Sequence, residues 1–121
     1  MKHHIKSIRT FIGSKDFNLS RNFYTDLGFT EVSLGEKLSF FKSEAFGFYL
    51  QDYYVKDWLD NSMVFVEVDS VERYWKELQE LKLPEKYPNA KLTPIKEDSW
   101  GKECFVHDPS GVLWHFGEFY D

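Results

Sequence analysis

Residues 62–82 read SMVFVEVDSVERYWKELQELK and contain the clearest strand pattern and the clearest helix pattern of the chain. Residues 62–68 alternate in the manner of a strand with two different faces. One face carries Val64, Val66 and Val68, and the other carries Met63, Phe65 and Glu67. The stretch therefore begins with a strand that has one aliphatic face and one mixed face.

A helix follows this strand. Val71, Tyr74, Trp75, Leu78 and Leu81 recur at helical spacing, which predicts an amphipathic helix that ends near Lys82. Asp69, with Glu72 three residues later, predicts a capping box at its start.

Three further strands are expected after a loop that contains Pro84, Pro88 and Asn89. They are predicted at residues 91–97, 102–107 and 112–119. A four-residue turn at 108–111 would join the last two strands and would place Cys104 opposite His115. Residues 62–119 thus follow the order βαβββ.

The first half of the chain shows the same order. A strand, a helix and three strands are predicted at residues 5–13, 18–27, 30–34, 37–43 and 46–51. Asp16 and neighbouring residues supply the cap of the helix and Gly28 ends it. Residues 52–61 have no clear period and are interpreted as a connector. We therefore predict a single α+β domain over residues 1–121, made of two βαβββ units, at about 5–51 and 62–119.

Composition narrows the classes of function. The 121 residues carry a net charge of −5 with no basic cluster, which argues against nucleic-acid binding. The single Cys104 excludes an internal disulfide, and no apolar run is long enough to cross a membrane. With no leader pattern visible, a cytoplasmic location is expected. The aromatic fraction of 19% and the negative charge favour an aromatic or cationic ligand.

Several motifs resemble those of a known family. They are Ser14-Lys15-Asp16-Phe17, Phe23-Tyr24-Thr25-Asp26-Leu27-Gly28-Phe29, Val66-Glu67-Val68-Asp69, Trp100-Gly101, Asp108-Pro109-Ser110-Gly111 and Trp114-His115-Phe116. Together they resemble the vicinal oxygen chelate superfamily, and within it the bleomycin resistance proteins. The resemblance implies a homodimer, curled mixed sheets around a cleft, a ligand site near the subunit interface and exchange of an arm from the first strand.

The same resemblance indicates where a metal site would lie. Metal-dependent members of the superfamily take ligands from four strand positions, which correspond here to Arg9, Tyr49, Met63 and His115. Only His115 is a good ligand, and an open catalytic site for a divalent cation needs about three. Neither a metal nor another cofactor is therefore expected.

The family positions and strand alternation together predict the lining of a binding cleft. The candidate residues are Arg9, Phe11, Tyr49, Gln51, Met63, Phe65, Glu67 and His115, with Trp100 at the rim and Trp58 in the connector. Trp58 fits closure over the cleft and a dimer contact equally well.

Three functional hypotheses remain open. The first is a metal-independent dimeric protein that sequesters an aromatic or cationic small molecule. The second is a glyoxalase-like or dioxygenase-like enzyme, either metal-dependent or using His115, Glu67 or Tyr49 as acid and base. The third is a dimeric domain with a closed pocket, in which Trp58 and Trp100 serve protein contacts.

Overall fold

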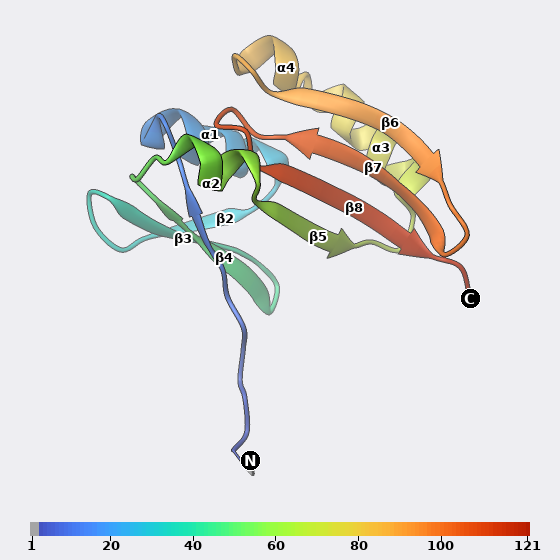
Figure 1. Ribbon diagram of the computed structural model, residues 1–121, viewed down its shortest axis with the longest axis horizontal. Coiled ribbons are helices and arrows are strands. Elements are labelled where there is room, and N and C mark those ends of the chain that lie inside the picture. Colours follow the sequence, from blue (N-terminus) through green and yellow to red (C-terminus); the bar gives the residue numbers. More distant parts are fainter. Residues whose placement is uncertain (1–2) are drawn as a thin grey trace.

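The computed structural model describes residues 3–121, which form two mixed four-stranded sheets with helices packed against them (Figure 1). The strand order is β1-β4-β3-β2 in the first sheet and β5-β8-β7-β6 in the second. In each sheet the first pair in this order is parallel and the other pairs are antiparallel. The identical orders confirm the α+β class and the two βαβββ units, and neither sheet closes into a barrel.

The first unit follows the sequence pattern closely. It consists of β1 (Phe11–Gly13), α1 (Phe17–Leu27), β2 (Thr30–Ser33), β3 (Leu38–Ser43) and β4 (Phe46–Gln51). Asp16 caps α1, because its Oδ1 accepts a hydrogen bond from the Leu19 N–H at 3.1 Å. Gly28 ends the helix with a φ of 120°, in the region that favours glycine.

The rest of the chain, the connector and the second unit, contains more helical structure than the pattern predicts. The remaining elements are α2 (Lys56–Asp60), β5 (Met63–Glu67), α3 (Val71–Leu81), α4 (Leu83–Lys86), β6 (Lys91–Glu97), β7 (Gly101–His107) and β8 (Leu113–Phe119). The short helix α2 lies in the expected connector, and α4 lies in the expected loop. Each buries one leucine, Leu59 in α2 and Leu83 in α4, so tertiary burial stabilises turns that have no periodic pattern.

The prediction of a strand from residue 5 was wrong for its first six residues. Only Phe11–Gly13 pairs, with β4, although the Thr10 carbonyl also accepts a hydrogen bond from the Tyr49 N–H at 2.9 Å. Residues 3–10 are here called the N-terminal arm; its last two residues, Arg9 and Thr10, still contact β4, and the residues before them run away from both sheets (Figure 1). Ile5 and Ile8 are 75% and 88% exposed. The strand pattern of the arm is present, but no strand of its own chain lies beside it.

The cap of α3 also differs from the prediction. Ser70 is the N-cap and its Oγ accepts a hydrogen bond from the Arg73 N–H at 3.3 Å. Asp69 pairs instead with the Arg73 guanidinium at 2.6 Å, and the Val71 N–H donates to Glu118 on β8. The contact with Glu118 comes from the far end of the chain and has no local signal.

The turn between β7 and β8 is one residue longer than expected. Cys104 lies opposite Phe116, and His115 lies opposite Phe105, not opposite Cys104. The cause is Asp108, whose Oδ1 accepts hydrogen bonds from the Ser110 and Val112 N–H groups at 2.8 and 2.9 Å. These bonds hold residues 108–112 in a wider loop.

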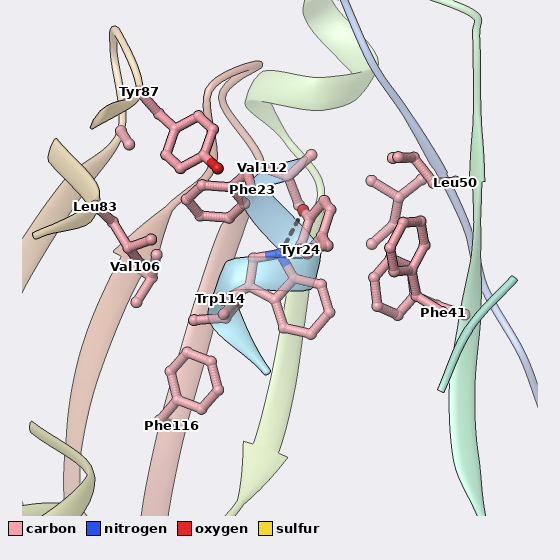
Figure 2. Close-up of a cluster of buried hydrophobic side chains, with 14 of the residues drawn as sticks. Phe23, Tyr24, Phe41, Leu50, Leu83, Tyr87, Val106, Val112, Trp114 and Phe116 are labelled. Carbon is pink, nitrogen blue, oxygen red and sulfur yellow. Dashed lines mark hydrogen bonds between the residues drawn. The ribbon is translucent and has the colours of Figure 1, made fainter. Parts of the chain in front are cut away.

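The two units share one core around Tyr24 of α1 (Figure 2). The Tyr24 ring contacts Phe41 and Phe48 of the first sheet and Trp114 of the second. Phe48 and Trp114 also touch directly, with ring centroids 5.1 Å apart. Each sheet therefore has one face in this core and one face outside it. We call the outside face of the β1-β4-β3-β2 sheet the first outer face, and the outside face of the β5-β8-β7-β6 sheet the second outer face. Within residues 3–121, no helix combines the length and the apolar character that crossing a bilayer requires.

Candidate ligand-binding site

The first outer face carries an aromatic platform with a fixed cation. Tyr49 of β4 stacks on Phe11 of β1, with ring centroids 4.7 Å apart, and contacts Phe40 of β3 at 5.2 Å. The guanidinium of Arg9 donates to the Tyr49 hydroxyl at 2.9 Å and lies 4.3 Å from the centre of the Phe40 ring. These contacts hold the cation against two rings and leave Phe11 58% exposed.

Strand pairing explains why these side chains meet. Phe11 and Phe40 are both register partners of Tyr49, on the two sides of β4. Arg9, Phe11 and Tyr49 were all expected in the cleft lining, and the structure brings them together. Phe40 was missed, although alternation along β3 could have identified it. Gln51 follows Tyr49 by two residues and lies on the same face, opposite Leu38.

The second outer face centres on His115. Its Nδ1 lies 2.7 Å from the Glu103 carboxylate, and its Nε2 lies 3.4 Å from the sulfur of Met63. A carboxylate accepts hydrogen bonds, so the Nδ1–H donates to Glu103 and Nε2 is left facing Met63. Phe105 lies edge-on to the imidazole at 5.0 Å. Glu103 was missed because the expected hairpin register was wrong by one residue, and the register of the structure places it on this face.

Trp100 belongs to an aromatic cluster on the same face. Its ring centroid lies 6.0 Å from that of Phe65 and 5.2 Å from that of Phe119. The centroids of these two phenylalanine rings are 5.6 Å apart. Phe65 and Phe119 are 44% and 50% exposed. Phe65 also lies 6.3 Å from the His115 ring, so the cluster is continuous with the imidazole. Phe119 was missed, because the sequence pattern did not distinguish the two faces near the end of the last strand.

Glu67 and Arg9 border a groove of about 1170 Å³ between the arm, the start of β4 and the edge strand β5. Val64, Val66 and Val68 form part of its wall, and Phe65 lies at its border. The groove is thus lined by residues of both sheets.

Trp58 stands apart from these groups. It is 61% exposed on α2, and its aromatic neighbour is Tyr53, at 5.8 Å. Among the described residues no aromatic contact joins Trp58 to the side chains of either outer face.

The four family positions for metal ligands do not fit a metal ion. Arg9 and Tyr49 are hydrogen-bonded to each other on one sheet, while Met63 and His115 meet on the other. An arginine repels a cation, and a thioether is a poor ligand for the hard divalent ions. Within residues 3–121, no three His, Cys, Asp or Glu side chains are grouped so that they could hold a metal.

Cys104 is not positioned as a nucleophile. It points into the core and is fully buried, and this burial raises the pKa of its thiol to about 11. The corrected register also separates it from His115, which was its expected partner.

Comparisons with known proteins bear on the fold. No family model matches the sequence, and no curated protein matches it. Among solved structures, the bleomycin resistance determinant encoded on the transposon Tn5 superposes with a TM-score of 0.80 at 13% identity, over 97% of this chain and 100% of that one. A bleomycin-binding protein from Streptomyces verticillus, complexed with copper(II)-bleomycin, gives 0.79 at 18% identity, over 99% and 100%. The fosfomycin resistance protein FosX from Listeria monocytogenes, complexed with Mn(II) and sulfate, gives 0.73 at 14% identity, over 97% and 93%.

These structures are all members of the vicinal oxygen chelate superfamily. The chain therefore has the fold of these structures, and the fold that the sequence motifs implied is confirmed. The two mixed sheets of this chain match those of the bleomycin resistance fold, and neither sheet closes into a barrel.

Proposed function

We propose that the protein binds an aromatic or cationic small molecule without a metal and without altering it covalently. The observation that carries this proposal is the pair of outer faces, each of which presents exposed aromatic rings beside a fixed polar group. On the first face the polar group is Arg9 over Phe40, and on the second it is the Glu103–His115 pair beside Phe65. Rings supply stacking area at low entropic cost, and the polar groups orient the ligand.

The two outer faces cannot meet within one chain, because their opposite faces share the core around Tyr24. A homodimer solves this problem if the first outer face of one subunit opposes the second outer face of its partner. The ligand then lies between the two sheets, near the subunit interface. Solved bleomycin-binding proteins of this fold support a small-molecule site, since one is complexed with bleomycin.

The N-terminal arm supports the dimer. Its Ile5 and Ile8 are mostly exposed, and it borders a groove whose wall includes Val64, Val66 and Val68. Isolated exposed apolar residues are ordinary, but an unpaired extended arm that faces the edge strand β5 across a groove is suited to pairing with a second copy. The arm then contributes to the partner's fold, and Arg9 reaches the cleft from it.

The ligand hypothesis is tested by titrating metal-stripped protein with bleomycin while Trp fluorescence is recorded. Trp100 contacts Phe65 and Phe119 and should report occupancy of the second outer face. We expect saturable quenching at about one ligand per subunit that persists with a chelator, and loss of most of the signal in Trp100→Phe. Trp75→Phe on α3 is the matched control and should keep the response. Saturable binding that appears only when a divalent metal is added would contradict the proposal.

The dimer is tested independently by sedimentation equilibrium. We expect the mass of two chains for the full protein and a shift toward monomer when residues 1–8 are removed. Ile5→Ser/Ile8→Ser makes the same test with the chain length unchanged. A full-length protein that is monomeric at all concentrations would contradict the two-subunit cleft.

A second candidate function is acid and base catalysis, and the Glu103–His115 contact favours it. A carboxylate on Nδ1 orients the imidazole and leaves Nε2 free to accept a proton from a substrate. Recovery of the bound compound with unchanged mass after long incubation supports sequestration. A product that forms with wild-type protein and not with His115→Gln would replace the binding proposal with the enzymatic one.

A further inference from the structure

A pocket of about 540 Å³ lies at the end of the second sheet where β7 ends and β8 begins. Its polar lining includes Lys15, Tyr54, Asp60, Asn61, Lys91 and His107. The aromatic cluster around Trp100 is not part of its wall. Met63 and Leu113 also line it, and the Met63 sulfur lies 3.4 Å from Nε2 of His115.

The pocket has an excess of positive charge in a protein whose net charge is −5. Lys15 and Lys91 both line it, and within residues 3–121 neither has a carboxylate within 4.0 Å. Asp60 is the acidic residue of the wall, and its Oδ2 is held by Lys56 at 2.6 Å. Two lysines without an ion-pair partner among the described residues therefore line a space in which the carboxylate is already paired.

His107 adds a directed hydrogen-bond donor. Its Nδ1 is buried and has no hydrogen-bond partner among the described residues. A proton on this atom would be a buried N–H without an acceptor, so the favoured tautomer carries its proton on Nε2. The ring is half-buried and lines the pocket, and Nε2 is not among the buried unpaired atoms. The Nε2–H is therefore available at the pocket.

The position of the lysines follows from the fold. Lys91 is the register partner of His107 at the start of β6, so the two side chains lie side by side. The backbone N–H of Lys15 donates to Ser110 Oγ at 2.9 Å, which ties the segment before α1 to the β7–β8 loop. The Lys15 ammonium lies 5.8 Å from the Tyr54 ring, on the pocket wall.

We propose that this pocket binds a small oxyanion, a carboxylate or a phosphate group, through Lys15, Lys91 and the Nε2–H of His107. Ammonium groups and a neutral N–H donor suit an anion with several acceptor oxygens. The proposal concerns a site beside the cleft and does not depend on the aromatic ligand proposed above.

The test is isothermal titration of the full chain at low ionic strength, with inorganic phosphate in one arm, acetate in a second, and chloride at matched ionic strength in a third. We expect one site per chain for phosphate or acetate and none for chloride. Lys15→Gln/Lys91→Gln should weaken binding at least about tenfold. Lys76→Gln/Lys86→Gln removes the same charge outside the pocket and should bind as the wild type does. The anion that binds more tightly, phosphate or acetate, shows whether the site recognises a phosphate or a carboxylate group.

Thermal unfolding without added anion shows whether the pocket variant is folded. His107→Phe, which removes the donor and keeps a ring, is a second variant and should also weaken binding. Equal affinity of the wild type and Lys15→Gln/Lys91→Gln would overturn the proposal. Equal loss in both lysine variants would do the same, because it would indicate a general effect of net charge.

Discussion

Tyr24 and Asp108 form a buried hydrogen bond that joins the two βαβββ units. The Tyr24 hydroxyl donates to Asp108 Oδ2 at 2.5 Å and accepts from the Trp114 Nε1–H at 2.9 Å. The Trp114 contact is drawn in Figure 2. All three side chains are essentially inaccessible to solvent. One phenol thus satisfies two buried polar groups from the second unit, and Asp108 in turn shapes the β7–β8 loop.

Replacing Tyr24 by Phe should destabilise the protein by about 2 to 4 kcal/mol, because it leaves the Trp114 N–H unpaired and Asp108 with one hydrogen bond fewer. The free energy of unfolding in urea measures this loss. Tyr53→Phe removes the hydroxyl of an exposed tyrosine and is the control, for which we expect almost no change. A loss no larger than that of Tyr53→Phe would show that the Tyr24 hydroxyl contributes nothing.

The loss in Tyr24→Phe should depend on pH. Burial raises the pKa of Asp108 above its usual 3.8, and the hydrogen bonds from Tyr24 and the loop amides limit the rise. Removing the Tyr24 hydroxyl should raise the pKa of Asp108 further, so burying the carboxylate becomes more costly as pH increases. Below pH 3.8 Asp108 is protonated in the folded and the unfolded chain. The stability difference between wild type and variant should therefore be smallest there and grow toward neutral pH.

The loss on breaking the ion pair between Arg21 and Glu31 should also be larger at neutral pH than in acid, although the pKa of this carboxyl is lowered by folding, whereas that of Asp108 is raised. Burial favours a higher pKa for Glu31, but hydrogen bonds from Arg21 at 2.6 Å and Ser39 at 2.5 Å outweigh it and lower the pKa below 4.5. Such a carboxylate stabilises the fold above its unfolded pKa and loses this effect as pH falls through its folded pKa.

Arg21→Met should therefore cost below about 1 kcal/mol at neutral pH, because the pair is partly exposed, and the cost should vanish in acid. Urea unfolding at several pH values measures it. Arg73→Met breaks the more exposed pair with Asp69 and should have less effect at neutral pH. A larger loss in acid than at neutral pH would contradict the assignment.

Local patterns predicted the elements of this fold where one apolar face is buried. The alternating valines of β5 and the helical spacing in α3 are visible because one side of each element packs on the core. The arm, α2 and the cap at Ser70 were mispredicted, because the first lacks a partner in its own chain and the others depend on tertiary contacts such as that of Glu118 with Val71.

The candidate site was predictable to the extent that it follows strand alternation. Arg9, Phe11 and Tyr49 were expected together, and they are together. Glu103 was missed, because its face depends on the hairpin register, and the register depends on how Asp108 bonds to its own loop. A turn that is one residue longer thus changes which side chain lies beside His115.

Cys104 should react with a thiol reagent only when the protein unfolds. The side chain is fully buried and burial raises the pKa of the thiol to about 11, so neither access nor thiolate is available in the folded state. We expect negligible labelling of native protein and one thiol per chain in denaturant. The rate of Cys104 labelling should be higher in Tyr24→Phe than in the wild type, in proportion to the lower stability of the variant. Fast labelling of native wild-type protein would show that the second sheet opens locally.

Two glycines support the aromatic rings of the outer faces, and substituting each by alanine should have a different result. A Cβ at Gly117 would lie 2.4 Å from Cζ of Phe65, which is the far end of a side chain on an exposed face. A Cβ at Gly47 would lie 2.4 Å from Cζ of Phe40 and also 2.7 Å from the Phe41 carbonyl oxygen, which is backbone. A ring can turn away, whereas a paired strand cannot move without losing hydrogen bonds.

Gly47→Ala should therefore be destabilised by about 1 to 3 kcal/mol and Gly117→Ala by less. Gly117→Ala should instead shift Trp fluorescence and weaken ligand binding, because Phe65 is pushed out of its contact with Trp100. Adding Phe65→Leu shortens the ring that clashes, so the double variant should be more stable than the sum of the two single losses predicts. Urea unfolding of the four proteins in this cycle measures the coupling. Additive losses would mean that Gly117 is required for the strand itself and not for the ring that lies over it.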